Sequence, residues 1–340
     1  LATCGLCCCD LRNSTEVTAC TAADVSSVLE LPQLPPGLQT WSQFLYILPL
    51  ARKVWKSVVG QRDASFRLLV ETVLSRQVRA VHVHGGPGTG KTHLVRAVAA
   101  ATHQPFCKKH LADLFSRRTN WRDIFPRQNN WRDCLKQLFT DACQDAQHSA
   151  TSDEDGDGGA VQPSGTIVCI DEVDGLGPYG ILSTLELDRF CEALIAELQR
   201  LRQSGTNITV ITAGQQMRGN MQQILFGDGG FDIMVEVLLP SESDREDILR
   251  KGMQKLLCNS SSCSSGSSGS SSSALDLRTI AKAMEGATPS NLDAGVRDAA
   301  HCALIRSIGQ SVELVVTQQD LNEAFAPQIQ HLEVLSARTR

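Results

Sequence analysis

The stretch Gly85-Gly-Pro-Gly-Thr-Gly-Lys-Thr92 decides the fold of this 340-residue chain. It matches the pattern G-x-x-x-x-G-K-[ST] at every position, and it lies between an apolar run at 81–84 and a helical pattern that starts at Lys91. Glycines let backbone N–H groups turn inward around phosphates, and the start of a helix directs its positive dipole end at them. This context predicts a phosphate-binding loop between a strand and a helix.

The loop predicts which residues contact a bound nucleotide. We expect Lys91 to reach the β- and γ-phosphates, and the hydroxyl of Thr92 to bind Mg²⁺, which the phosphates bridge. A glycine-rich turn that binds nothing is the alternative, and the flanking strand and helix make it the weaker one. The residues assigned to nucleotide binding here are Gly86, Pro87, Gly88, Thr89, Gly90, Lys91, Thr92 and His93.

An acidic motif follows about eighty residues later, in Thr166-Ile-Val-Cys-Ile-Asp171-Glu172. Neighbouring side chains of a strand point to opposite sides, so Asp171 is expected to hold a Mg²⁺-bound water. Glu172, which points elsewhere, is expected to orient the attacking water and accept its proton. An acidic pair at the end of a strand is common by itself, but after a complete phosphate loop it indicates the second half of a nucleotide site.

Apolar runs and helical periods alternate from about Trp55 onward. Strand-like runs are expected at 81–84, near Pro105, and at 166–170, 208–212 and 233–238; helices are expected at 91–101, 131–146 and 185–202. This alternation predicts the α/β class, a doubly wound parallel five-stranded sheet with helices on both faces. Later, the spacing is purely helical through 275–284, 291–305 and 317–329, which predicts a small all-helical C-terminal unit.

These patterns divide the chain into segments. We expect an irregular N-terminal segment or linker at 1–50, an α/β nucleotide-binding core at 51–257, a Ser/Gly-rich insertion at 258–273, the helical unit at 274–330 and a tail at 331–340. The serine tract and an acidic insertion at 149–165 contain too few apolar residues to fold, so both are expected to be mobile.

Composition limits the classes of function. The formal net charge of -5 and the isoelectric point near 5.9 give no general electrostatic reason to expect nucleic acid. No apolar run reaches the length of a membrane-spanning helix. Most cysteines lie singly in apolar runs, so we expect an intracellular, cytoplasmic protein. The crowded cysteines at 4–9 lack a second pair at ligand spacing, and we assign no metal to them.

From about Val54 to Gln328 the chain resembles the AAA family of ATPases, the group that contains katanin, spastin, peroxisomal biogenesis ATPases and valosin-containing protein. The segments that carry the resemblance, besides the phosphate loop, are Trp55-Lys-Ser-Val-Val-Gly60, Asp171-Glu-Val-Asp-Gly-Leu176, Phe231-Asp232, 240–250, Ala283-Met-Glu-Gly-Ala-Thr-Pro-Ser-Asn-Leu292 and 296–300. The resemblance implies ATP and Mg²⁺ as cofactors, a helical lid over the core, a hexameric ring with identical or different AAA subunits, and a polypeptide substrate or adaptor. It also implies that Val59 and Gly60 lie beside the adenine, and that Gln215 replaces the family's sensor asparagine.

The departures from the family pattern concern hydrolysis and the pore. The positions that the family gives to two trans-acting arginines are Gly227 and Gly230 here, and Arg218 is a weak substitute. Such arginines are worth about 10³–10⁵ in rate, so turnover is expected to be slow. Three bulky residues, Trp121, Ile124 and Phe125, occupy the segment of the family's translocation loop; they either grip a polypeptide or pack against their own sheet.

Two interpretations of function follow. In the first, an AAA module binds and hydrolyses ATP and thereby remodels proteins or protein assemblies. In the second, the module binds ATP as a structural or regulatory ring of a tandem or mixed assembly and hydrolyses little by itself. A DNA-loading initiator is disfavoured because no basic winged-helix appendage is present, and a GTPase because no Asn-Lys-x-Asp sequence occurs.

Overall fold

The computed structural model of the protein describes residues 38, 40–74, 78–115, 131–151, 165–174, 184–215, 217, 220–260, 275–310 and 315–339. The chain divides into two compact units, 1–46 and 47–340. Helix α2 (Trp41–Ser57) begins in the first unit, and the second contains the sheet and every helix from α3 onward.

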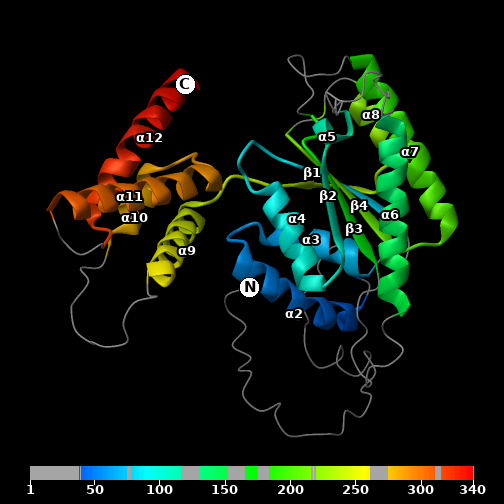
Figure 1. Ribbon diagram of the computed structural model, residues 1–340, viewed down its shortest axis with the longest axis horizontal. Coiled ribbons are helices and arrows are strands. Elements are labelled where there is room, and N and C mark those ends of the chain that lie inside the picture. Colours follow the sequence, from blue (N-terminus) through cyan, green and yellow to red (C-terminus); the bar gives the residue numbers. More distant parts are fainter. Residues whose placement is uncertain are drawn as a thin grey trace, which may run out of the picture. The chain divides into compact units, whose positions relative to one another are not determined.

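The sheet is all-parallel and has five strands, as the sequence predicts (Figure 1). Its order is β2-β3-β4-β1-β5, and the strands are β1 (Arg79–His84), β2 (Phe106–His110), β3 (Thr166–Asp171), β4 (Ile208–Gly214) and β5 (Ile233–Glu236). Every residue of β3 and of β4 is buried, as expected of strands whose two faces are both covered by helices. The carboxyl ends of β1, β3 and β4 lie at one edge of the sheet, where doubly wound folds bind ligands.

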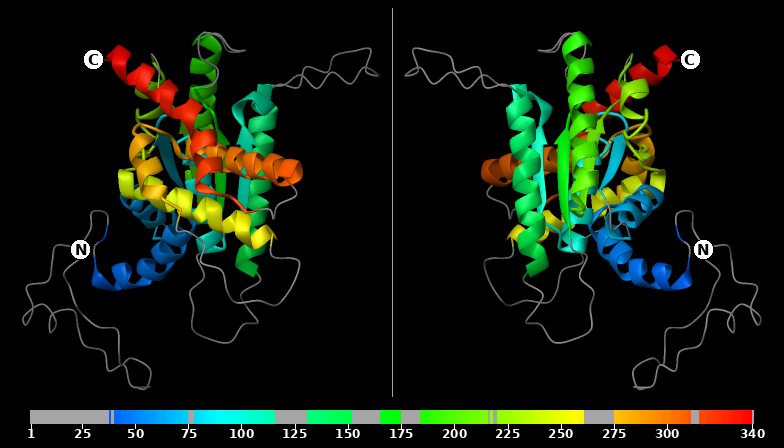
Figure 2. Two further views of the ribbon diagram at one scale, coloured as in Figure 1. Left: turned by 90° about the vertical axis from the view of Figure 1, so that its left-hand side faces the viewer. Right: turned by 90° about the vertical axis from the view of Figure 1, so that its right-hand side faces the viewer.

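Helices cover both faces of the sheet (Figures 1 and 2). Helices α6 (Trp131–Thr151), α7 (Thr184–Ser204) and α8 (Met221–Leu225) share a core cluster with β3 and β4, in which Phe139 and Phe190 are fully buried. Helices α3 (Arg62–Val73) and α4 (Lys91–Thr102) contact each other and the sheet, while the short α5 (Leu111–Phe115) follows β2. The doubly wound architecture is therefore confirmed.

The C-terminal helices form the predicted helical lid. It consists of α9 (Glu242–Ser260), α10 (Leu277–Ala283), α11 (Pro289–Gln310) and α12 (Gln318–Thr339), which enclose their own apolar cluster around Phe325. Buried Arg245 of α9 donates from Nε to the Ala281 carbonyl at 2.7 Å and from Nη1 to the Pro240 carbonyl at 3.0 Å. These bonds attach α9 to α10 and to the segment that precedes α9.

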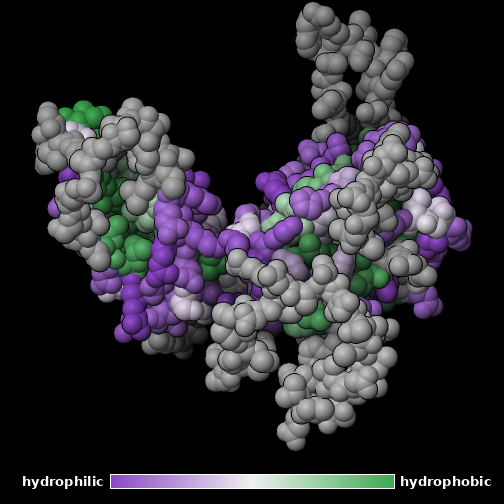
Figure 3. All heavy atoms as spheres, turned by 90° about the horizontal axis from the view of Figure 1, so that it is seen from below, coloured by the Kyte–Doolittle hydropathy of each residue, from purple (hydrophilic) through white to green (hydrophobic). Residues whose placement is uncertain are grey.

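The face drawn in Figure 3 is largely hydrophilic over the described residues, with hydrophobic side chains visible only in smaller areas. None of the helices in the described part of the chain combines the length and apolarity needed to cross a bilayer.

Four expected boundaries differ from the structure, two of them because α6 and α9 continue into the expected insertions, to Thr151 and Ser260. Residues 41–50 lie in α2, although an irregular segment was expected through 50, because Ile47, Ala51 and Val54 recur at helical spacing and are fully buried. Similarly, α12 continues through the expected tail to Thr339, and Leu332 still packs against the lid cluster. The acidic insertion from 152 to 164 and the serine tract from 261 lie outside the described residues.

A buried ion pair at the start of α12 gives a test of lid stability. Asp320, with a side chain only 3% exposed, accepts two bonds from Arg306, and Thr317 donates to it from N and from Oγ1, each at 2.8 Å. The hydrogen bonds from Arg306, followed by those from Thr317, outweigh burial and lower the pKa of Asp320 from 3.8 to about 2. Because the folded pKa is the lower one, this stabilisation is complete above pH 4 and is lost as the pH falls towards 2.

We expect Asp320→Asn to lower the free energy of unfolding by roughly 1.5–3 kcal/mol at pH 7. Asp247→Asn, which alters an exposed pair with Arg250 on α9, is the matched control and is expected to change it by less than about 0.5 kcal/mol. Urea unfolding of the lid measures the free energy of unfolding of both variants. The difference in this free energy between wild type and Asp320→Asn should become smaller at pH 3. A gap that stays constant with pH contradicts the assigned charge interaction.

Candidate nucleotide-binding site

The phosphate loop connects β1 to α4, where the sequence places it. Gly88 (φ 74°) and Gly90 (φ 95°) have left-handed backbone conformations that L side chains rarely adopt. Thr89 is buried, and its Oγ1 donates to the Gly86 carbonyl at 2.8 Å, which braces the turn. The loop thus ends at the start of α4 with Lys91 as the first helical residue.

Lys91 lies over the loop that is predicted to hold phosphates. Its Nζ donates to the carbonyls of Gly85 and Gly86, each at 2.8 Å. Burial lowers the pKa of Lys91, while the nearby carboxylates of Asp174, Asp171 and Glu172 act in the opposite direction. A phosphate group offers the ammonium stronger acceptors than these neutral carbonyls.

Thr92 and Asp171 lie side by side, as the two sequence motifs predict. The Thr92 hydroxyl donates to Asp171 Oδ2 at 2.7 Å, and Asp171 is 5% exposed. Both groups are hard oxygen donors, and Mg²⁺ in proteins is typically held by one or two such groups together with substrate phosphates and water. The residues present therefore fit the predicted metal. Among the described residues, no cluster of three or more His, Cys, Asp or Glu side chains is placed to hold a metal ion by itself.

Glu172 is largely exposed, unlike the buried Asp171, and it lines the same cavity. Its side chain is 69% exposed, and its backbone has φ 58°, a left-handed conformation that is uncommon outside glycine. Such strain is frequent at functional sites. His110 Nδ1 lies 3.7 Å from Glu172 Oε2, a distance at which the two pair only when the histidine is protonated.

Lys108 of strand β2 was not found by sequence reasoning. Its Nζ lies 2.8 Å from Asp171 Oδ2, the same oxygen that accepts from Thr92. Burial tends to raise the pKa of Asp171, but the hydrogen bonds from Lys108 and Thr92 outweigh it, and the pKa is lowered. The only sequence signal was a pair of lysines in the short edge strand Phe106–His110.

A cavity of about 760 Å³ extends from the phosphate loop to the lid. Val59 and Gln215, both predicted as site residues, line this cavity together with Pro87 to His93 of the loop region. Gly60 lies outside its lining and faces a smaller cavity of about 380 Å³ beside α9. Gly86 also lies outside the lining and contributes its carbonyl to Lys91 and Thr89.

Gln215 is held through its backbone. Its N–H donates to Asp174, which also lines the cavity and which sequence reasoning assigned no role. The lid contributes Lys251, Lys255 and Asp293 to the same cavity, and these too were not predicted. They lie far along the chain from the phosphate loop and belong to no motif that carries a spacing signal.

The lid contacts the phosphate loop directly. The Ser290 N–H donates to the Gly88 carbonyl at 3.3 Å, and a Cβ added at Gly88 would lie 2.9 Å from Thr288 Oγ1. Any side chain at position 88 would therefore separate the start of α11 from the loop. This contact gives a path by which the occupancy of the loop can alter the position of the lid.

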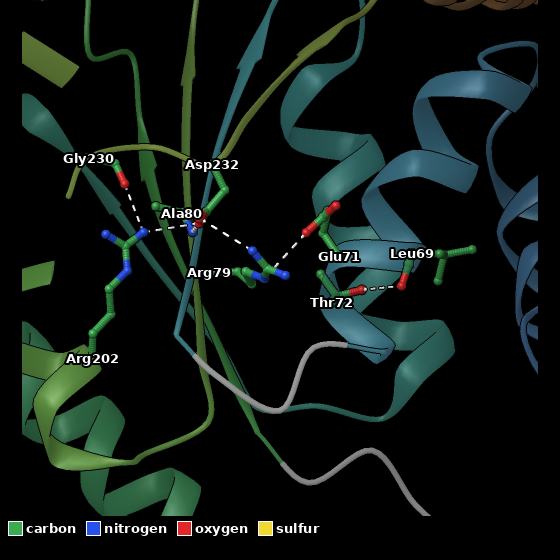
Figure 4. Close-up of polar contacts among 8 residues, drawn as sticks. All are labelled: Leu69, Glu71, Thr72, Arg79, Ala80, Arg202, Gly230 and Asp232. Atoms are coloured by element: carbon green, nitrogen blue, oxygen red, sulfur yellow. Dashed lines mark hydrogen bonds and ion pairs between the residues drawn. The ribbon is translucent and has the colours of Figure 1, made fainter. Parts of the chain in front are cut away.

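The loop containing Gly227 and Gly230 is closed by an arginine from another element (Figure 4). Arg202, near the end of α7, donates to the carbonyls of Gly229 and Gly230 and, at 3.1 Å, to Asp232 Oδ2. Asp232 in turn accepts from the Ala80 N–H at 2.7 Å and pairs with Arg79 of β1, which also lies 3.6 Å from Glu71 of α3 (Figure 4). This network holds the loop against the sheet.

The two glycines of this loop differ in the space around them. A Cβ added at Gly230 would lie 2.1 Å from the Leu225 carbonyl oxygen, so no side chain fits there unless the loop moves. Gly227 is exposed, and an added Cβ would lie 3.1 Å from the Gln223 carbonyl oxygen, which a small shift relieves. Arg218 and the three bulky residues of the predicted pore segment lie outside the described residues.

Comparison with known proteins identifies relatives of the same kind as the sequence resemblance. Residues 81–238 match the family model described as the ATPase family associated with various cellular activities (AAA). The chain is 28% identical over 247 residues to cell division control protein 48 homolog B of Arabidopsis thaliana, which covers 72% of this chain and 34% of that protein.

Two further relatives are named for the proteasome. The proteasome-activating nucleotidase of Thermococcus kodakarensis is 26% identical over 260 residues, or 75% of this chain and 53% of that protein. The 26S proteasome regulatory subunit 8 homolog B of Arabidopsis thaliana is 26% identical over 263 residues, or 76% of this chain and 52% of that protein. The chain thus spans about a third to a half of the length of these relatives.

Proposed function

We propose that this chain, whose residues 81–238 match the AAA family model, binds ATP with Mg²⁺ in the cavity beside the phosphate loop and hydrolyses it. We further propose that nucleotide state drives the remodelling of proteins or protein assemblies by an oligomeric ring inside the cell. The observation that carries the proposal is the meeting of Lys91, Thr92, Asp171 and Glu172 at one edge of the sheet. The katanin and spastin subgroup named by the resemblance is not part of the proposal.

The residues of the chain divide the work of hydrolysis between them. Lys91 exchanges its hydrogen bonds to the Gly85 and Gly86 carbonyls for hydrogen bonds to phosphate oxygens, and so stabilises the charge of the β- and γ-phosphates. Thr92 and Asp171 would hold Mg²⁺, which when bound neutralises charge on the transferring phosphoryl group. Glu172 is not one of the residues assigned to the metal and its side chain is exposed to the cavity, so it accepts the proton of the attacking water. Gln215 offers an amide at the same edge to orient that water.

Coupling to remodelling is proposed to pass through the lid. The contact between Ser290 and Gly88 joins the start of α11 to the phosphate loop, and Lys251 and Asp293 line the same cavity. A ligand can shift a conformational equilibrium only through interactions that differ between the two states. Phosphates in the loop would change these lid contacts and thereby favour one lid position over another.

The loop that contains Gly227 and Gly230 favours a second candidate function. In it the module binds ATP as a structural or regulatory ring and depends on a different subunit for turnover. Among the described residues, Arg202 is the arginine that contacts this loop, and its guanidinium is already bonded to two carbonyls and to Asp232. A neighbouring pocket would then receive no arginine from positions 227 and 230. Such residues are worth about 10³–10⁵ in rate, so this difference decides between the two candidates.

An arginine restored at one position separates these candidates. We expect the wild-type chain to hydrolyse ATP at less than about 1 s⁻¹ even at concentrations where it assembles. Gly227→Arg should raise that rate at least about tenfold, and only at those concentrations, because the new cation acts on a neighbouring pocket. Gly227→Ala is the matched control, since it adds the same Cβ without the charge. Restoring Gly230→Arg is not a clean test, because that side chain collides with the Leu225 carbonyl.

If the wild-type chain already turns over at about 1–100 s⁻¹, the assignment of positions 227 and 230 is wrong. If Gly227→Arg assembles and binds ATP but gains no turnover over Gly227→Ala, the structural or regulatory candidate is favoured instead.

A further inference from the structure

Lys108 is a half-buried cation that the proposed reaction does not use. It lies on β2, an edge strand whose residues pair in register with β3, so that His110 is opposite Asp171. Side chains two residues apart share a face of a strand, and Lys108 and His110 accordingly approach the two neighbouring carboxylates, Asp171 and Glu172. Lys109, between them, is exposed on the other side.

The pair that Lys108 makes is close and shielded. Its Nζ lies 2.8 Å from Asp171 Oδ2, and the two side chains are 22% and 7% exposed. The Thr92 hydroxyl donates to this same oxygen at 2.7 Å. Asp171 Oδ2, the oxygen that would serve the metal, therefore already accepts from two donors, one of which bears a full positive charge.

We propose that Lys108 neutralises Asp171 in the absence of metal, so that this site binds nucleotide with only weak dependence on Mg²⁺. The inference rests on the proposed nucleotide site and adds a residue that tunes its metal requirement; Lys108 acts through Asp171 and is a positioning residue. Two electrostatic consequences support it. A metal-free triphosphate does not meet an uncompensated carboxylate, and an arriving Mg²⁺ must displace or share the ammonium's partner.

Removing the ammonium should change metal dependence in a defined direction. In Lys108→Met the Asp171 carboxylate is left with two neutral donors, the Thr92 hydroxyl and the Glu172 backbone N–H, so it repels metal-free ATP and attracts Mg²⁺ more strongly. The ratio of the ATP dissociation constant in EDTA to that in MgCl₂ should therefore rise at least about tenfold over wild type. Lys108→Arg keeps the charge and should return the ratio towards the wild-type value.

The experiment is isothermal titration of the folded chain with ATP, once in EDTA and once in MgCl₂. Lys109→Met, which removes an exposed lysine from the same strand, is the matched control and should leave the ratio unchanged. An unchanged ratio in Lys108→Met, or an equal change in Lys109→Met, overturns the inference. A wild-type chain that binds ATP in neither buffer would instead overturn the nucleotide site itself.

A second variant tests the pair from its other side should Lys108→Met fail to fold. Asp171→Asn leaves the ammonium without its carboxylate, so ATP binding in EDTA, where no metal ligand is needed, should tighten relative to wild type. Unchanged or weaker binding in EDTA contradicts the inference.

Discussion

Lys91→Ala is expected to weaken ATP binding at least about 30-fold, because the charge that faces the β- and γ-phosphates is lost. Lys91 Nζ donates to the carbonyls of Gly85 and Gly86, and because Gly85 is half-buried and Gly86 exposed, water can hydrate these carbonyls when the side chain is removed. The fold should therefore survive the substitution. Lys251 and Lys255 line the same cavity from the lid, but they lie on α9 rather than at the start of α4.

Isothermal titration with ATP and MgCl₂ measures the effect, and thermal unfolding checks that the variant remains folded. Arg96→Ala provides the matched control, since it removes one exposed positive charge from the same helix. Its affinity should stay within about twofold of wild type, as surface charges contribute little. Equal affinity of Lys91→Ala and wild type would remove the phosphate loop from the account.

Glu172→Gln is expected to retain ATP binding and to lose hydrolysis by about 10²–10⁴-fold, the range typical of general base catalysis. The amide keeps the shape of the side chain but cannot accept a proton. Glu172 is exposed, and its carboxylate lies 3.7 Å from His110, so little of the fold depends on its charge. The left-handed backbone at Glu172 is unaffected by the exchange.

Turnover is best measured with Glu172→Gln introduced into the Gly227→Arg variant, at a protein concentration at which that variant assembles and hydrolyses ATP. Glu192→Gln, an exposed residue of α7, serves as the control and should leave the rate unchanged. A Glu172→Gln variant with the parental rate would show that another group takes the proton, and His110 would be the first to examine because it lies within 3.7 Å.

The sheet and the motif residues could be predicted because each follows from a short local pattern. The phosphate loop and the buried run of β3 place their residues within a few positions of the observed bounds, and the helical period of the lid finds α10, α11 and α12, although α12 continues past its expected end to Thr339. Thr92, at the start of the helix after the phosphate loop, and Asp171, at the end of a buried strand, were both assigned to Mg²⁺, and their side chains meet at 2.7 Å.

Other parts of the site could not be predicted because they depend on register and on contacts between distant segments. Lys108 reaches Asp171 only because β2 and β3 pair as they do, and nothing in the local sequence fixes that register. The hydrogen bonds from Arg202 to the loop that contains Gly227 and Gly230 join two segments that are separated in sequence by the whole of β4. The first part of α2 was missed because no clear periodicity was found before residue 50; the helix also contains Pro49, a residue that is disfavoured in helix interiors.

The central claim is that the cavity beside the phosphate loop binds ATP, and titration of the wild-type chain with ATP in MgCl₂ tests it most directly. The account predicts saturable binding of a single nucleotide per chain, competition by ADP, and no competition by adenosine at the same concentration, because the phosphates supply the main contacts through Lys91 and the loop. The absence of saturable binding at millimolar ATP, by protein shown to be folded by circular dichroism and cooperative melting, would contradict it.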